Sequence, residues 1–228
     1  GKGHEEKDKI YKKFIRGCAE KKIPNGDAEK LWKTFEYFSG YGFNKSHAVS
    51  YSMLSYQCAW LSYYYPVEWM AAFLDKEPES RKEKAISIAK GLGFDIKEVS
   101  VNKSERHWAI LDDKTLVQPL LSIKGLGEKA IDEVLMHRPF DTIDELLFHD
   151  EIKHNKLNKK AVDVLIRAGA MNELIDDRFT GDKHFWSAVA VDKPRNKKKF
   201  AENIELYKPE GEFSDEERIE YLVKLTGM

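Results

Sequence analysis

The stretch LLSIKGLGEKAIDEVL, residues 120–135, predicts a tight hairpin that leads into an amphipathic helix. A hydrophobic lead-in is followed by Gly125-Leu126-Gly127. The apolar residues of the next segment recur at helical spacing and define one buried face: Ala130, Ile131, Val134 and Leu135. The two glycines permit a sharp turn and a close approach of the backbone to another molecule.

The start of this predicted helix is suited to binding an anion. The first N–H groups of a helix have no partner within it, and the helix dipole favours negative charge there. Lys124 and Lys129 add positive charge beside it. Lys124, Gly125, Leu126, Gly127 and Lys129 are therefore predicted to grip a nucleic-acid backbone without reading its bases, as a helix-hairpin-helix unit does.

A second, looser copy of this pattern follows. The helical segment DTIDELLF (141–148) leads through KHNKLN (153–158) to KKAVDVLIRAGAM (159–171). The second turn lacks the two glycines, and lysines cluster there instead. Its candidate DNA-binding residues are Lys156, Asn158, Lys159 and Lys160. Two such units related by pseudo-symmetry can hold both strands of a duplex.

The alternative is that Gly-Leu-Gly forms an ordinary turn, because the bare motif before a helix is common. Residues 124–171 hold eight Lys/Arg against nine Asp/Glu, so they are not net basic. Any binding by this region therefore depends on where the lysines are placed, and we expect it to be modest.

The composition of the 228-residue chain fits a folded protein and identifies no partner. Hydrophobic residues make up 42% and charged residues 34%, and the formal net charge is -1. Two cysteines, Cys18 and Cys58, form no metal or disulfide framework and fit a reducing compartment. Serines and a glutamine interrupt residues 48–65, so no membrane span is expected. The start at Gly1 suggests a processed product, an expression scar or a fragment.

The rest of the chain is predicted to be mainly α. Helices are expected at 5–22, 27–39 (with Asp27 as N-cap), 46–64 (with Ser46 or Asn44 as N-cap), from Pro66, and at 80–91. A hairpin or irregular strand pair is expected within 94–119, around Asp112-Asp113. Residues 172–228 read as less regular, and their KPRNKKK run (193–199) reads as a solvated loop.

Several stretches, in this order, resemble one protein family. They are KFIRGCAEKKIPNGDAEKLWKTFEYFSG (13–40), YGFNKSHAVSYSMLSYQCAWLSYYYPVEWMAAFL (41–74), VSVNKSERHWAI (99–110), SIKGLGEKAIDEV (122–134) and LNKKAVDVLIRAGAMN (157–172). Together they resemble the fingers segment and tandem helix-hairpin-helix domain of C-family bacterial and phage replicative DNA polymerases, the polymerase III alpha subunits. The resemblance covers about residues 8–172, and residues 176–228 have no match that we can assign.

The resemblance implies a nucleotide-binding cluster of Tyr41, Asn44, Lys45, Ser46 and His47. Lys45 can pair with a phosphate, and Asn44 and His47 can donate to phosphate or sugar oxygens. The apolar helix that follows would hold the cluster rigid. The alternatives are that Asn44 and Ser46 only cap this helix, that His47 is a satisfied half-buried histidine, and that the helix's aromatic residues serve only for packing.

The resemblance also implies a division of the chain. Residues 1–105 would be a fingers-type helical region, 106–119 a connecting β-like segment, 120–172 the tandem helix-hairpin-helix domain, and 173–228 a tail of unknown role. The family's Mg²⁺-binding carboxylates lie in a palm domain that precedes the fingers, and we find no match to it here. We therefore expect no catalytic residue and no metal or cofactor bound by this chain alone.

The expected partners are primer-template DNA, a deoxynucleoside triphosphate and a palm-containing polymerase portion, in bacterial cytoplasm or a phage-infected cell. No membrane partner is expected. Alternatively, the chain is a non-catalytic duplex-binding or scaffold module derived from such a polymerase. In a third interpretation it is a helical protein-interaction adaptor in which Gly-Leu-Gly is only a turn.

Overall fold

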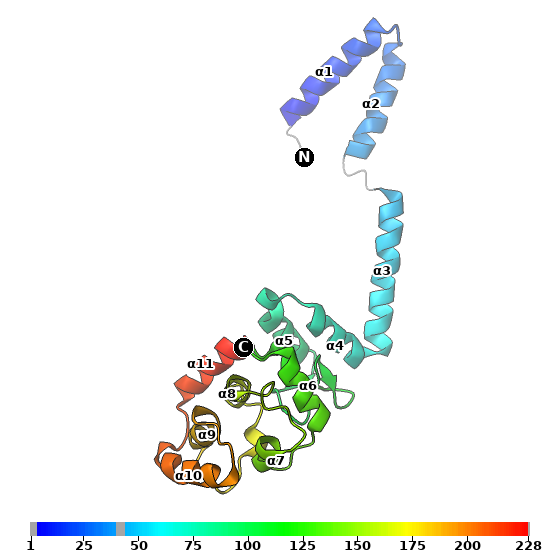
Figure 1. Cartoon of the computed structure of the whole chain (residues 1–228). Coiled ribbons are helices and arrows are strands. Elements are labelled where there is room, and N and C mark those ends of the chain that lie inside the picture. Colours follow the sequence, from blue (N-terminus) through cyan, green and yellow to red (C-terminus); the bar gives the residue numbers. More distant parts are fainter. Residues whose placement is uncertain (1–3, 40–43, 228) are drawn as a thin grey trace. The chain divides into compact units, whose positions relative to one another are not determined.

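The computed structural model of the chain describes residues 4–39 and 44–227. These residues divide between two compact units, Gly1–Ala59 and Trp60–Met228, and each is described by itself. The described residues are mainly helical with one small sheet, which confirms the predicted fold class (Figure 1). None of the helices in these two ranges is both long and apolar enough to cross a membrane.

Unit 1 begins with a pair of helices, α1 (His4–Glu20) and α2 (Asn25–Ser39). Their contact is aromatic: the ring centroids of Tyr11 and Trp32 lie 5.1 Å apart, and those of Phe14 and Trp32 lie 5.5 Å apart. Because α2 already begins at Asn25, Asp27 lies in its first turn and is not the N-cap that the sequence analysis expected.

Helix α3 (Lys45–Tyr64) follows and continues across the boundary between the units. None of its residues is buried. Tyr51, Tyr56 and Tyr63 are 58%, 71% and 78% exposed. In the part of the chain that the structure describes, the aromatic residues of this helix therefore lie on its surface and do not pack into a core.

Unit 2 has a smaller core built on α4 (Pro66–Lys76) and α5 (Lys82–Gly91), with the 3₁₀ turn Glu79–Arg81 between the two helices. Pro66 occupies the start of α4, as predicted. The buried residues of this core are Val67, Met70, Ala71, Leu74, Ala85, Ile86, Ala89, Trp108 and Leu116. The last two come from the small sheet and the segment leading into it.

The sheet has the order β1-β3-β2, with β1 (Asp95–Lys97) parallel and β2 (Ala109–Ile110) antiparallel to β3 (Thr115–Val117). The hairpin between β2 and β3 turns at Asp112, whose Oδ1 accepts the N–H groups of Lys114 (2.9 Å) and Thr115 (2.8 Å). These two hydrogen bonds explain the presence of Asp112 in an otherwise apolar segment.

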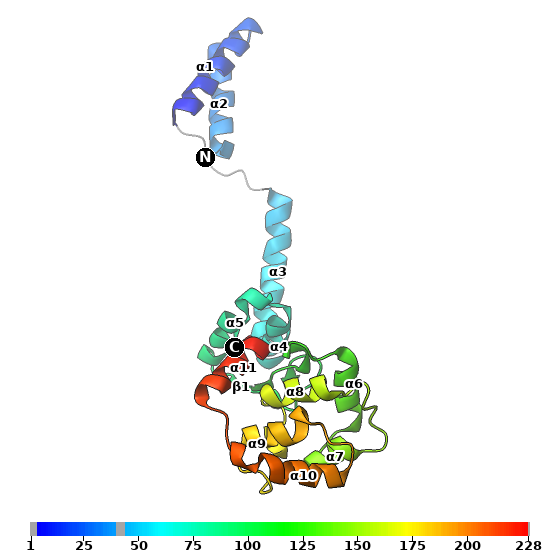
Figure 2. The ribbon, with the colours of Figure 1, turned by 60° about the vertical axis from the view of Figure 1, so that its left-hand side comes forward.

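The larger core of unit 2 joins the predicted hairpins to the C-terminal part of the chain. The elements around it include α6 (Glu128–His137), α7 (Ile143–Phe148), α8 (Lys159–Arg167), α9 (Asp182–Trp186), the π-helical turn Ser187–Val191, α10 (Lys197–Tyr207) and α11 (Asp215–Thr226). Three 3₁₀ turns complete the chain: Leu120–Ser122, Asn172–Leu174 and Lys208–Glu210. Figures 1 and 2 agree in placing α4 and α5 at one end of this unit and α9 and α10 at the other.

The C-terminal residues are more regular than the sequence analysis expected. Asn196 caps α10 by accepting the N–H of Lys199 at 2.8 Å, and Ser214 forms a capping box with Glu217 on α11. The last three residues of the KPRNKKK run, Lys197–Lys199, therefore begin a helix instead of forming a loop. Helix α9 and the π-helical turn that follows it bury a nearly continuous run from His184 to Ala190, which has no 3.6-residue periodicity for the sequence to show.

Candidate nucleic-acid interface

In the first hairpin, one of the two glycines has the backbone conformation that only glycine adopts readily. Gly125 has a φ of +89°, in the region that favours glycine. Leu126 is buried, and its N–H bonds to the carbonyl oxygen of Ile123 at 3.1 Å. The side chain of Leu126 therefore anchors the turn to the core, and its N–H is already satisfied within the turn.

The N-terminus of α6 is uncapped. Gly127 stands at the N-cap position with an ordinary φ of -78° and supplies no side chain to bond the helix. Within residues 4–39 and 44–227, the N–H groups of Gly127, Glu128 and Lys129 have no hydrogen-bond acceptor. A Cβ placed on Gly127 meets no atom within 4 Å, so the backbone here faces open space. These are the features of an anion site.

Two lysines flank this turn without an internal partner. In the described part of the chain, the side chains of Lys129 and Lys160 make no hydrogen bond or ion pair. The Cε of Lys160 lies 3.7 Å from the position that a Cβ on Gly125 would occupy. The fold thus brings a lysine of the second hairpin beside the glycine turn of the first.

The other candidate lysines are engaged within the protein. Lys124 Nζ lies 3.4 Å from an Oε1 of Glu79, and both side chains are about half exposed. Lys159 Nζ donates to the carbonyl oxygen of Val191 at 2.5 Å. Lys156 Nζ lies 3.2 Å from a carboxylate oxygen of Glu133, which is 3% exposed.

The Glu133 carboxylate is held by the second hairpin. It accepts the backbone N–H of Lys153 at 3.0 Å, and this bond, followed by the side chain of Lys156, keeps the pKa of Glu133 below its usual range despite burial. Lys156 therefore neutralises a buried charge, a role that the sequence analysis did not assign to it.

Helix α8 differs from α6 at its start. The Oδ1 of Asn158 accepts the N–H of Ala161 at 3.0 Å, so Asn158 is an ordinary N-cap. This bond uses one of the N–H groups that the second hairpin would need for a phosphate. The two hairpins therefore have the same order of elements, but the second helix starts with a side-chain cap and the first does not.

The predicted nucleotide cluster belongs to unit 1, whereas the hairpins belong to unit 2. Tyr41 falls outside the described residues. Asn44 caps α3: its Oδ1 accepts the Ser46 N–H at 3.0 Å, the Ser46 hydroxyl at 2.6 Å and the His47 N–H at 3.4 Å. The rings of His47 and Tyr51 lie 4.2 Å apart between centroids. Asn44 and Ser46 therefore take part in hydrogen bonds at the start of α3, while Lys45 is exposed.

This chain is similar both to a protein-family model and to individual proteins. A family model described as "Helix-hairpin-helix motif" matches residues 93–180. DNA polymerase III subunit alpha of Thermus aquaticus is 35% identical over 178 residues, covering 75% of this chain and 14% of the relative. The same subunit of Pseudomonas aeruginosa is 35% identical over 71% of this chain, and that of Deinococcus radiodurans is 33% identical over 80%; each match covers 14% of the relative.

The chain is homologous to a segment of DNA polymerase III subunit alpha. This confirms the resemblance noted from the sequence. The chain spans about 14% of the length of these alpha subunits. The helix-hairpin-helix match includes all of residues 120–172, where the sequence placed the two hairpins.

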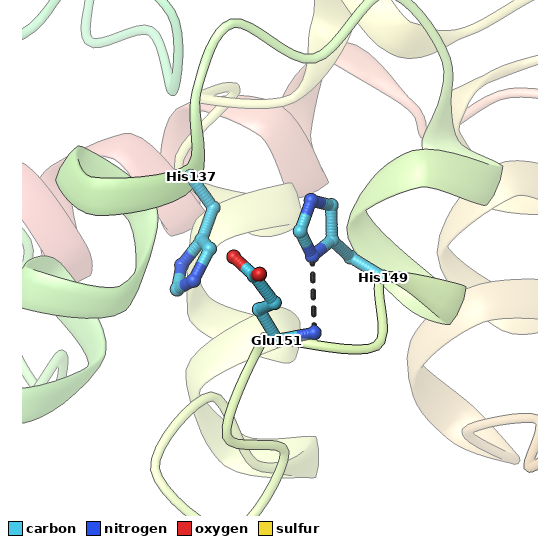
Figure 3. A group of neighbouring side chains, drawn as sticks. All are labelled: His137, His149 and Glu151. Carbon is cyan, nitrogen blue, oxygen red and sulfur yellow. Dashed lines mark hydrogen bonds between the residues drawn. The ribbon is translucent and has the colours of Figure 1, made fainter.

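A group of side chains that the sequence analysis missed lies on the other end of α6. Figure 3 shows His137, His149 and Glu151, with the Glu151 carboxylate pointing into the space between the two imidazoles. One potential metal-ligand atom from each lies within 4.8 Å of the others. Their irregular spacing along the chain matches no metal-binding motif. Only the three-dimensional structure, which brings the ends of α6 and α7 together, reveals the group.

Proposed function

We propose that this chain is part of a DNA-directed replicative DNA polymerase and grips the duplex backbone through its first hairpin. The observation that carries this is the uncapped N-terminus of α6, where three N–H groups and open space at Gly127 meet Lys129 and Lys160. Such a site binds a phosphate through its backbone and reads no base. Its homology to the polymerase III alpha subunit supports the assignment.

The test is fluorescence anisotropy of a labelled primer-template duplex titrated with the chain at several salt concentrations. Gly127→Val should lower affinity at least tenfold without loss of stability, because the φ of Gly127 suits valine and its Cβ meets no protein atom. Gly91→Val is the matched control, since its Cβ also meets nothing within 4 Å. Equal binding by the wild type and the Gly127 variant would refute the backbone clamp.

The lysines divide into two groups in the same assay. Lys160→Ala should reduce the slope of log K against log salt by about one, the expectation for one lost phosphate contact. Lys156→Ala should leave that slope unchanged, because Lys156 is paired with buried Glu133. The division would be contradicted if Lys156→Ala reduced the slope of log K against log salt and Lys160→Ala did not.

The fingers part of the proposal concerns the incoming nucleotide and template. By homology, Tyr41, Asn44, Lys45, Ser46 and His47 would contact a deoxynucleoside triphosphate, with exposed Lys45 meeting a phosphate. In polymerase reconstituted with its palm portion, Lys45→Ala should raise the KM for deoxynucleotides more than it changes primer-template affinity. An unchanged KM would leave Lys45 only as the first residue of α3.

Catalysis is proposed to need residues outside this chain. Two-metal nucleotidyl transfer uses carboxylates that hold Mg²⁺. Among the described residues, the group His137, His149 and Glu151 offers two imidazoles and one carboxylate, which does not fit that role. We therefore propose that the chain alone extends no primer, and that a palm-containing portion with Mg²⁺, in the bacterial cytoplasm or a phage-infected cell, restores extension. Failure to restore it would favour the non-catalytic duplex-binding module.

A further inference from the structure

The ends of two helices of unit 2 bring together residues that suit a transition-metal ion. His137 is the last residue of α6, and His149 directly follows α7, with Glu151 in the next turn. The two ring centroids lie 5.2 Å apart. The C-terminal end of a helix carries partial negative charge, so these helix ends favour a cation between them.

The ring of His137 is already oriented as a ligand. Its Nδ1 lies 2.9 Å from the backbone carbonyl oxygen of Glu133. A carbonyl oxygen only accepts, so Nδ1 carries the proton and Nε2 of the neutral ring has a free lone pair. A hydrogen bond of this kind from the other ring nitrogen is what fixes metal-binding histidines. The side chain of His137 is 7% exposed, which restricts its rotation further.

His149 and Glu151 are less constrained. The Nδ1 of His149 accepts the N–H of Glu151 at 3.2 Å, drawn as the dashed line in Figure 3. A metal ion bound by His149 replaces this hydrogen bond, because an Nε2 ligand requires the proton to sit on Nδ1. The Glu151 side chain is exposed and can move. The ligand atoms need to close from within 4.8 Å to the roughly 3.4 Å of a tetrahedral zinc site.

A cation also has a route to the site. A cavity of about 580 Å³ borders His149 and Glu151, and its wall includes the carboxylates of Asp144, Glu145 and Asp150. One lysine, Lys197, also lines it. Asp144 is paired with Arg178, so Asp150 and Glu151 are the carboxylates that favour a cation beside His149.

We propose that His137, His149 and Glu151 bind a divalent transition-metal ion, with Zn²⁺ the ion that fits best. Two imidazole nitrogens and one carboxylate oxygen are ligands that Zn²⁺ accepts, and a water molecule can take the fourth position. The ion would join the end of α6 to the connection between α7 and α8. That connection carries Lys156 and Asn158 of the second hairpin. The ion would therefore link the first hairpin's helix, α6, to the second hairpin.

The experiment titrates Zn²⁺ into the chelator-treated chain by calorimetry, and Co²⁺ by its visible absorption, in a Cys58→Ser background. We expect one site with a Kd below 10⁻⁵ M and, at a hundredfold excess of Zn²⁺ over Kd, a Tm increase of roughly 5 °C or more. Glu151→Gln and His149→Ala should each weaken binding at least tenfold. Mg²⁺ should not compete, because it prefers oxygen ligands.

His107→Ala is the matched control, because that imidazole is 65% exposed and lies beside Asp75, outside the group. It should bind Zn²⁺ as the wild type does. Glu151 is exposed, so Glu151→Gln keeps the test valid if His149→Ala fails to fold. Wild-type affinity in Glu151→Gln, or a wild type without a Zn²⁺ site, would overturn the proposal. The outcome is independent of DNA binding.

Discussion

Lysines in this chain show how the surroundings of a residue decide its role. Lys160 and Lys156 both come from the second hairpin, and only the first is left without an acceptor among the described residues. Lys193 is a third case. It is half-buried, donates from Nζ to the Leu157 carbonyl oxygen at 2.6 Å, and burial lowers its pKa to about 8.

Lys193 should make stability depend on pH in the alkaline range. Between about pH 8 and the ordinary value of 10.5, the unfolded chain keeps this proton and the folded chain has lost it. Stability therefore rises with pH across that window, and it gains nothing from this group below pH 8. The measurement is urea unfolding at several pH values for the wild type and Lys193→Met. The rise should be smaller in the variant; parallel curves would show that Lys193 titrates normally.

At the scale of elements, buried Glu133 connects α6 to the segment that enters α8. Its carboxylate bonds to the Lys153 N–H and pairs with Lys156, while its helix packs Ile131 and Val134 into the core. One acidic residue on an amphipathic helix thus faces inward, against the usual pattern. It is satisfied there only because the second hairpin supplies its partners.

Glu133→Ala should lower the free energy of unfolding by about 2–3 kcal/mol. This is less than the loss of a fully buried pair causes, because the Lys156 side chain is 35% exposed. Since the folded-state pKa of Glu133 is lowered, its contribution is present above the unfolded value of 4.5 and disappears as pH falls through the folded value. Glu128→Ala, with a side chain 78% exposed, is the control and should change stability by less than about 0.5 kcal/mol.

At the scale of the whole molecule, the C-terminal helices belong to the core of unit 2. Phe185, Phe200 and Leu225 share that core with Ile131 and Leu165. The Leu225 carbonyl oxygen accepts the N–H of Lys124 at 2.7 Å, directly before the glycine turn. Trp186 Nε1 donates to Asp163 on α8 at 2.8 Å. The hairpins are therefore supported from the far end of the chain.

A chain ending at residue 175 should lose its cooperative unfolding transition, because it uncovers the apolar surface that the C-terminal helices bury. Circular dichroism during urea unfolding measures this. A chain lacking residues 1–39 is the control and should keep the transition, since neither buried core of unit 2 contains a residue from α1 or α2. A sharp unfolding transition in the chain that ends at residue 175 would show that the hairpins fold without the C-terminal helices.

Local pattern predicted the mainly helical fold, Pro66 at the start of α4 and the Gly125 turn, because each depends on neighbours within a few residues. The same pattern supported the homology to the polymerase. Burial was less predictable: no residue of apolar α3 is buried, whereas acidic Glu133 is buried. Burial depends on what packs against an element, which its own periodicity does not contain.

The candidate site divides in the same way. The sequence by itself determined the hairpin and the set of lysines around it, since glycine conformation and side-chain charge are properties of single residues. Only the tertiary structure decided that Lys160 lies beside Gly125, that Lys156 is taken by Glu133, and that His137 meets His149 and Glu151. These relations join residues 12 to 35 positions apart, and such pairings are set by how the helices pack.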